Sequence, residues 1–229
     1  MATLYGARNN TDGLVLYLDV GNYKSYISGS TTLTDLSGNN NSGSIFNNPV
    51  FDSGSGGNIR FFSGSTQYVE TPSIAGLGTS NRTFMCWFNV PTTPVGVAPR
   101  ILTFPADNTS TDRPAIAVTC YGNLTMEIGF GGTPYDGYIT RTFALNTWYH
   151  LAAIISGSTV TVYRNMSLLG SASNTGLVGA NPIGQIARYN ANYGQYSDAK
   201  VSMLAVYNRA LSAEEILQNF NAQRSRFGV

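Results

Sequence analysis

Short apolar segments recur along the whole chain, separated by turns rich in Gly, Asn, Ser and Thr. Segments such as Leu14–Asp19, Phe84–Val90 and Trp148–Ile155 have the length of strands rather than helices. About a dozen of them at regular spacing, without an alternating helical pattern, indicate two packed antiparallel sheets. The sequence therefore predicts an all-β sandwich.

Two stretches have the pattern of a hairpin. The clearest joins Ala152–Ile155 to Thr159–Tyr163 through the turn Ser156-Gly157-Ser158. In the other, Ile59–Phe62 and Gln67–Glu70 flank Gly64-Ser65 like the two arms of a hairpin. We expect both pairs to form.

One helix is predicted near the C-terminus. Ser212 is a good N-cap, and Glu215 lies three residues further on as its capping-box partner. Ile216 and Phe220 share one face, so the helix is expected from about Ala213 to Gln223, docked near the sandwich edge. We expect three parts in all: an arm at 1–12, one domain at 13–220 that includes the C-terminal helix, and a tail at 221–229.

The charge pattern excludes several classes of partner. Charged residues make up 11% of the chain, against roughly 25% in ordinary soluble domains. The net charge is +1 with no basic cluster, so nucleic-acid binding is not expected.

No apolar run is long enough to span a membrane, and the first residues lack the apolar core of a secretory signal. Cys86 and Cys120 fall in predicted strands, where we expect buried free thiols rather than a disulfide framework.

Several motifs together resemble the concanavalin A-like, laminin-G-like lectin and glucanase superfamily, in the version found in tailed-phage structural proteins. The matching stretches are GLVLYLD at 13–19, TDLSGNNNSG at 34–43, FFSGSTQYV at 61–69, FMCWF at 84–88, WYHLA at 148–152 and, most specifically, VYNRALSAEEI at 206–216. Residues 219–228 resemble the tail of the phage versions. The resemblance implies a two-sheet antiparallel jelly roll, but a shared fold does not establish a function.

Many relatives bind calcium through carboxylates and carbonyls. Relatives often carry an acidic residue in the last strand, where this chain has Met203. Asp19, Asp35 and Asp198 remain as candidate ligands, and the alternative role of all three is to cap turns. No other cofactor is expected.

Some relatives are glycoside hydrolases, which need two carboxylates roughly 5–9 Å apart. In the family these come from a Glu-x-Asp-x-Glu strand, whereas neither Glu70 nor Glu127 has an acidic residue two positions on. Glu214 and Glu215 belong to the first turn of the helix. The single histidine, His150, lies mid-strand, and we expect it to be packed or to face an edge. The sequence therefore predicts no enzyme.

Two loops combine Tyr with Asn, Asp and Gly, which suits sugars because sugars have apolar faces ringed by hydroxyls. The alternative is that these loops pack on their own domain or on a neighbouring subunit. The candidate glycan or partner contacts are Tyr135, Tyr138, Tyr189, Asn190, Asn192, Tyr193 and Tyr196.

The resemblance and the composition together predict a non-enzymatic phage virion protein, either a capsid decoration or a tail-associated fibre protein. We expect it at the virion surface after synthesis in the host cytoplasm, in contact with other virion proteins and as a homo-oligomer. Adhesion to host-surface glycans is a second expected role. The alternative is a free-standing carbohydrate-binding lectin.

Overall fold

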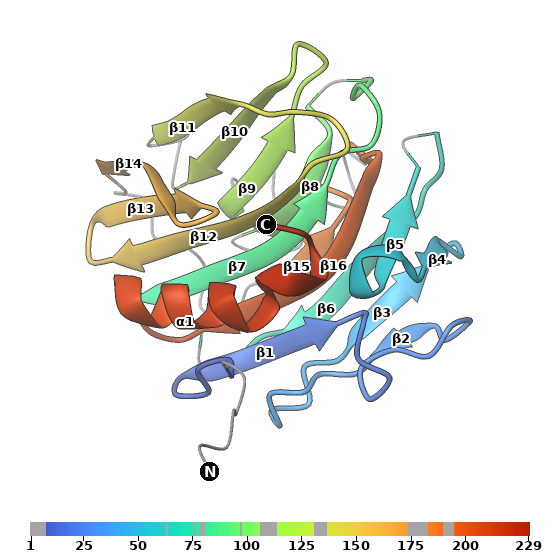
Figure 1. The fold of residues 1–229 in the computed structure, drawn as a ribbon, viewed down its shortest axis with the longest axis horizontal. Coiled ribbons are helices and arrows are strands. Elements are labelled where there is room, and N and C mark those ends of the chain that lie inside the picture. Colours follow the sequence, from blue (N-terminus) through green and yellow to red (C-terminus); the bar gives the residue numbers. More distant parts are fainter. Residues whose placement is uncertain are drawn as a thin grey trace.

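A computed structural model describes residues 8–62, 64–75, 77, 81–96, 98–105, 114–130, 137–173, 183–189 and 195–229. In this part of the chain two eight-stranded antiparallel sheets pack face to face as a jelly-roll sandwich, with one α-helix near the C-terminus. Figure 1 shows the helix lying across one sheet, with the second sheet behind it. The predicted fold class is confirmed.

Sheet A carries the helix on its outer face. Its order is β14 (Ser167–Ser173), β13 (Thr159–Arg164), β12 (Trp148–Ser156), β7 (Arg82–Asn89), β16 (Ala199–Tyr207), β5 (Asn58–Phe61) and β4 (Val50–Asp52). The eighth strand, β1 (Leu14–Asp19), pairs with the part of β16 that β5 leaves free. The predicted hairpin between β12 and β13 is confirmed, since Ile155 pairs with Val160.

Sheet B is formed by the remaining strands. Its order is β11 (Gly137–Thr142), β10 (Thr125–Phe130), β9 (Pro114–Cys120), β8 (Arg100–Pro105), β15 (Ile183–Ile186), β6 (Tyr68–Ser73), β3 (Gly43–Phe46) and β2 (Thr32–Leu33). The second predicted hairpin is wrong, because β5 belongs to sheet A and β6 to sheet B. The two arms pair with different strands far away in sequence, β5 with β16 and β6 with β15.

The main core lies between the two sheets and follows the alternation of side chains along each strand. In β7, Phe84, Cys86 and Phe88 face this core. Cys120 reaches the same core from β9, and both cysteines are free and buried, as predicted. Burial raises the pKa of the Cys86 thiol to about 12. Neither thiol is therefore ionised at neutral pH.

A second apolar cluster lies under the helix α1 (Ala213–Gln223), on the outer face of sheet A. Met85 and Trp87 point to this side of β7, where Ile216 and Phe220 of the helix are also buried. The helix bounds and the capping box of Ser212 and Glu215 are as predicted. Its expected place near an edge is wrong, because the apolar outer surface that it covers belongs to the central strands β12, β7 and β16.

The last residues fold back onto this cluster. After the 3₁₀ turn η2 (Arg224–Arg226), Phe227 is buried between Trp87 and Trp148, with ring centroids 4.0 and 4.9 Å away. Arg226 donates from both terminal nitrogens to the buried carboxylate of Asp19, at 2.8 and 2.9 Å. The segment predicted as a tail, 221–229, thus completes the helix and packs on sheet A.

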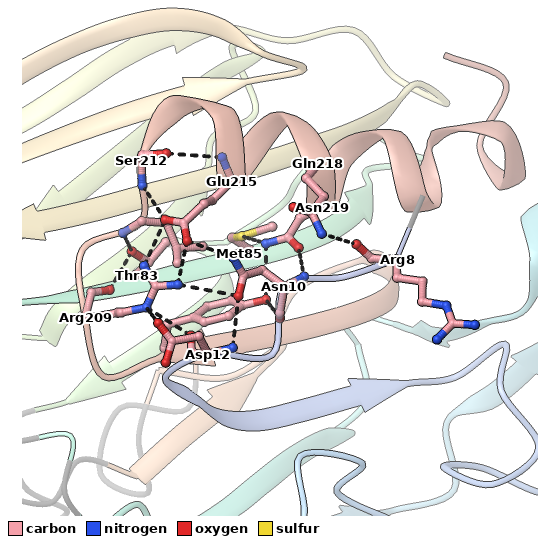
Figure 2. Close-up of polar contacts among 12 residues, drawn as sticks. Arg8, Asn10, Asp12, Thr83, Met85, Arg209, Ser212, Glu215, Gln218 and Asn219 are labelled. Atoms are coloured by element: carbon pink, nitrogen blue, oxygen red, sulfur yellow. Dashed lines mark hydrogen bonds and ion pairs between the residues drawn. The ribbon is translucent and has the colours of Figure 1, made fainter. Parts of the chain in front are cut away.

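The described part of the predicted arm is also anchored (Figure 2). Asn10 donates from its side chain to Glu215 and accepts with its backbone carbonyl from the hydroxyl of Tyr207, at 2.7 and 2.9 Å. Arg209 reaches both Glu215 and the Asp12 carboxylate. The motif at 206–216, which carries most of the family resemblance, therefore joins the first strand, the last strand and the helix.

In the described part of the chain, no helix is both long enough and apolar enough to cross a membrane.

Candidate functional site on the outer face of sheet B

The outer face of sheet B lies opposite the helix-covered side of the molecule. Alternation sends Val69, Val118 and Ile128 into the core and turns their neighbours Glu70 and Glu127 outward. The outward-facing residues continue onto the neighbouring strands, because Gln185 is paired with Glu70 on one side and with Thr103 on the other. This face is therefore polar at these positions, whereas the part of the outer face of sheet A that lies under α1 is apolar.

An ordered stack of side chains crosses three of these strands. Phe46 of β3 and Tyr68 of β6 are directly paired, and their rings stack with centroids 4.4 Å apart. The guanidinium of Arg188, which follows β15, lies 3.6 Å from the centroid of the Tyr68 ring. Because β3 and β15 flank β6 on opposite sides, the two faces of the Tyr68 ring are covered and its edge is left to the surface.

Glu70 is held at the base of this stack. Arg188 forms an ion pair with Glu70 at 2.5 Å, and the side-chain amide of Gln185 donates to the same oxygen at 3.0 Å. The Glu70 side chain keeps 26% of its surface exposed, whereas that of Arg188 is nearly covered. The carboxylate is thus fixed in orientation and still reachable from solvent.

Three buried polar atoms on this face have no hydrogen-bond partner in the described part of the chain: Thr103 Oγ1, Gln185 Oε1 and Arg188 Nε. Leaving such an atom unsatisfied costs about 1–3 kcal/mol. All three come from neighbouring positions of β8, β15 and the residues that follow β15. Because all three atoms are covered by the protein, an enclosed water is the partner that would satisfy them.

The predicted glycan contacts are placed as follows. Tyr196 is half-buried, with its ring centroid 6.4 Å from that of Tyr68, so it borders the stack. Tyr189 is 7% exposed and lies under the guanidinium of Arg100, which leaves little ring surface for a ligand. Tyr138 is 51% exposed but lies on β11, at the far edge of the sheet. Tyr135, Asn190, Asn192 and Tyr193 lie outside the described residues.

We call Phe46, Tyr68, Glu70, Arg188 and Tyr196 the Tyr68 surface. Sequence reasoning found only Tyr196 as a contact and dismissed Glu70, because it tested that residue for catalysis alone. The sequence does contain a signal for this site, because Tyr68 and Glu70 alternate with the apolar Val69 and must therefore share the outer face of the sheet. The pairing of β3, β6 and β15 has no local signal.

The candidate calcium ligands each have protein partners. Asp19 pairs with Arg226, and Asp198 with Arg60 at 2.5 Å. Asp35 accepts from the backbone nitrogens of Tyr17, Ser37 and Asn41 at 2.9–3.0 Å, as expected of a carboxylate that holds a turn. Within the described ranges no group of three or more His, Cys, Asp and Glu side chains is placed to hold a metal ion. Calcium binding stays a prediction.

His150 is packed, as expected. It lies in the cluster under α1, with ring centroids 5.1 Å from Trp87 and 5.5 Å from Phe220. Burial lowers the pKa of His150 to about 3, and neither ring nitrogen has a hydrogen-bond partner. It is neutral at physiological pH and is remote from the outer face of sheet B.

Comparison with solved structures gives the same architecture at low sequence identity. Trypanosoma rangeli sialidase in complex with sialic acid matches with a TM-score of 0.73 and 17% identity, over 93% of this chain and 33% of the sialidase chain. The binding domain of Paraclostridial Mosquitocidal Protein 1 matches with a TM-score of 0.65 and 19% identity, over 91% of this chain and 52% of that chain. The protein thus spans a third to a half of these structures, and the likeness establishes the fold alone.

A search of curated protein sequences found no match. The sequence model of the Concanavalin A-like lectin/glucanases superfamily matches residues 63–217, about two thirds of the chain. This range contains the Trp-bearing strand β7, the strand β12 and the motif that leads into α1. The chain belongs to the concanavalin A-like lectin/glucanases superfamily.

Proposed function

We propose that this domain binds carbohydrate at the Tyr68 surface and does not hydrolyse it. The observation that carries the proposal is the half-buried aromatic group of Phe46, Tyr68 and Tyr196, with the fixed and partly exposed carboxylate of Glu70 beside it. Sugars are recognised by aromatic side chains for their apolar faces and by oriented polar groups for their hydroxyls. Both kinds of group are held here by neighbouring strands of one sheet.

The spacing of the acidic residues supports binding without hydrolysis. Glu70 on β6 and Glu127 on β10 both point outward, but β15, β8 and β9 lie between their strands. Four strand spacings of about 4.8 Å separate them by roughly 19 Å. Paired carboxylates of glycoside hydrolases are about 5–9.5 Å apart. In addition, Glu70 is committed to its ion pair with Arg188.

A glycan array followed by isothermal titration calorimetry tests this proposal. Sialic acid belongs on the array because solved complexes of the related sialidase contain it. We expect saturable binding that falls at least tenfold in Tyr196→Ala and in Glu70→Gln. Leu168→Ser, an exposed substitution on β14 of sheet A, is the matched control and should leave binding unchanged. Absence of saturable binding, or equal affinity in all variants, would overturn the proposal.

Hydrolysis is tested separately on the same protein. We expect no release of the chromophore from a panel of nitrophenyl glycosides, and no release of sialic acid from sialyllactose. Turnover that is lost in Glu70→Gln would assign a catalytic role to this carboxylate and contradict the non-enzymatic part of the proposal.

We further propose that the domain is displayed on a tailed-phage virion, as a capsid decoration or a tail-associated fibre protein, in contact with other virion proteins. The support is the resemblance of the motif at 206–216 and of residues 219–228 to phage versions of the family. The low charge also fits a protein whose surface is partly covered in an assembly. A free-standing lectin is the alternative.

Light scattering after size-exclusion chromatography separates these roles. Removing residues 1–7 spares the bonds of Asn10 and Asp12 to the domain, whereas removing 1–12 breaks them. A stable oligomer that is lost in the 1–7 deletion would support assembly through the arm, and a stable oligomer of all forms would support assembly through the domain. A monomer in every form would favour the free-standing lectin.

A further inference from the structure

Two adjacent depressions open at the edge of the sandwich where β4 of sheet A approaches β2 and β3 of sheet B. Their volumes are about 230 and 280 Å³, and both are lined by Tyr26 and Phe51. The two rings lie 5.5 Å apart at 45° and form a shared floor. Neither depression contains a residue of the Tyr68 surface.

The lining of both depressions is uncharged. Besides Tyr26 and Phe51 it consists of Ser28, Gly29, Ser30, Thr31, Ile45, Asn48 and Pro49 in the first and Val20, Gly21, Tyr23, Ser53, Gly56 and Gly57 in the second. The two carboxylates that adjoin the lining along the chain are both paired, Asp19 with Arg226 at 2.8 Å and Asp52 with Lys200 at 2.7 Å. An ionic ligand would find no counter-charge among these lining residues.

The polar groups of the lining have hydrogen-bonding capacity to spare. No side-chain hydrogen bond joins Ser28, Thr31, Asn48 or Ser53 to any other described part of the protein, and all four residues are exposed. Tyr23 is 76% exposed and Ile27 is 69% exposed beside them. Free hydroxyl and amide groups thus stand next to exposed aromatic and aliphatic surface.

The walls are held in place before any ligand arrives. The carbonyl of Asn22 accepts from the backbone nitrogens of Ser25 and Tyr26, at 2.8 and 2.9 Å. On the opposite wall, the side chain of Asn47 donates to the carbonyl and hydroxyl of Thr66, at 2.7 and 2.9 Å. Pre-organised walls lower the entropic cost of binding.

We propose that these two depressions, named here the Tyr26 cleft, bind a short neutral saccharide with one sugar unit in each depression. Tyr23 and Phe51 contact the apolar faces of the sugars, and the hydroxyls bond to Ser28, Thr31, Asn48 and Ser53. Each depression is smaller than the roughly 300–1,000 Å³ of a site for a drug-sized ligand, which fits one sugar unit better than a larger compound. The proposal adds a second carbohydrate site and does not depend on the Tyr68 surface.

Calorimetric titration with maltose, cellobiose, lactose and N,N′-diacetylchitobiose tests the cleft. We expect saturable binding of at least one of these neutral disaccharides. Affinity should fall at least tenfold in Tyr23→Ala, which removes an exposed ring, and in Asn48→Asp, which places a charge in the lining. Tyr23→Phe keeps the ring and should retain binding. Leu168→Ser, a substitution of an exposed residue on β14 of sheet A, is the control and should leave binding unaffected.

The outcomes separate this site from the Tyr68 surface. Binding that is lost in Tyr23→Ala and Asn48→Asp but kept in Tyr196→Ala and Glu70→Gln supports the cleft. Binding with the opposite dependence, or no saturable binding of any of the four disaccharides, overturns it. Unfolding curves that coincide with that of the wild type show that a loss of binding is not a loss of fold.

Discussion

Phe227 stacks on Trp87 with ring centroids 4.0 Å apart and planes at 14°. Trp87 belongs to a central strand of sheet A, and Phe227 is the third residue from the end of the chain. The outer face of the sheet is therefore closed by the terminal residues together with α1. This contact belongs to the cluster on the outer face of sheet A and not to the core between the sheets.

Phe227→Ala should lower the free energy of unfolding by about 3 kcal/mol, because it removes a buried ring from between two tryptophans. Urea unfolding followed by tryptophan fluorescence measures the change. Val229→Ser, which alters a 40% exposed residue two positions on, should change stability by less than about 0.5 kcal/mol. Equal effects of the two substitutions would contradict the packing described here.

His150 should make the protein less stable as the pH falls below 6.5. Its pKa is about 3 in the folded protein because of burial, against 6.5 when exposed, so the unfolded chain binds the proton more tightly. The contribution of neutral His150 to the free energy of unfolding is fully present above pH 6.5 and falls by about 2 kcal/mol between pH 7 and pH 5. Carboxylates with lowered pKa, such as Glu215 at about 2, titrate below this window.

The variant His150→Leu tests whether His150 causes the loss of stability between pH 7 and pH 5. Both ring nitrogens of His150 lack partners, so an apolar side chain of similar size should not reduce stability at pH 7 by more than about 1 kcal/mol. Its urea midpoint should change much less between pH 7 and pH 5 than that of the wild type. An unchanged pH dependence would assign the effect to other groups.

Gly21→Ala should destabilise the protein by about 3 kcal/mol. An added Cβ would lie 1.8 Å from the carbonyl oxygen of Gly56 and 2.1 Å from a terminal nitrogen of Arg226, so the ion pair of Arg226 with Asp19 must shift. Thermal unfolding measures the loss. Gly64→Ala meets nothing within 4 Å and needs no left-handed backbone, so it should be neutral or slightly stabilising.

Glu215→Ala should cost about 1–2 kcal/mol, whereas Glu214→Ala should cost clearly less. Glu215 completes the capping box and accepts from Arg209 at 2.6 and 2.8 Å (Figure 2). Glu214 is an adjacent acidic residue of the same first turn and has no partner of this kind in the described structure. Urea unfolding of the two variants provides the comparison, and equal losses would show that the Arg209 contact contributes nothing.

Much of the fold was predictable because its signals are local. The apolar runs at 84–90 and 148–155 are buried on both faces, so their strands can be predicted from the local sequence without knowing which strands they pair with. The limits of α1 followed from Ser212 and Glu215, since a capping box acts within four residues. The strands β2, β3 and β4 were missed because they are short and lack a long apolar run.

The sequence by itself determined the alternation of inward and outward side chains, the turns and the helix start, because each depends on residues a few positions apart. Only the tertiary structure decided which strands are neighbours. It separated Ile59–Phe62 from Gln67–Glu70 into different sheets and brought Tyr68 between Phe46 and Arg188. Pairing across such distances is selected by how all the strands bury their apolar faces together, so the candidate site emerged from the sandwich as a whole.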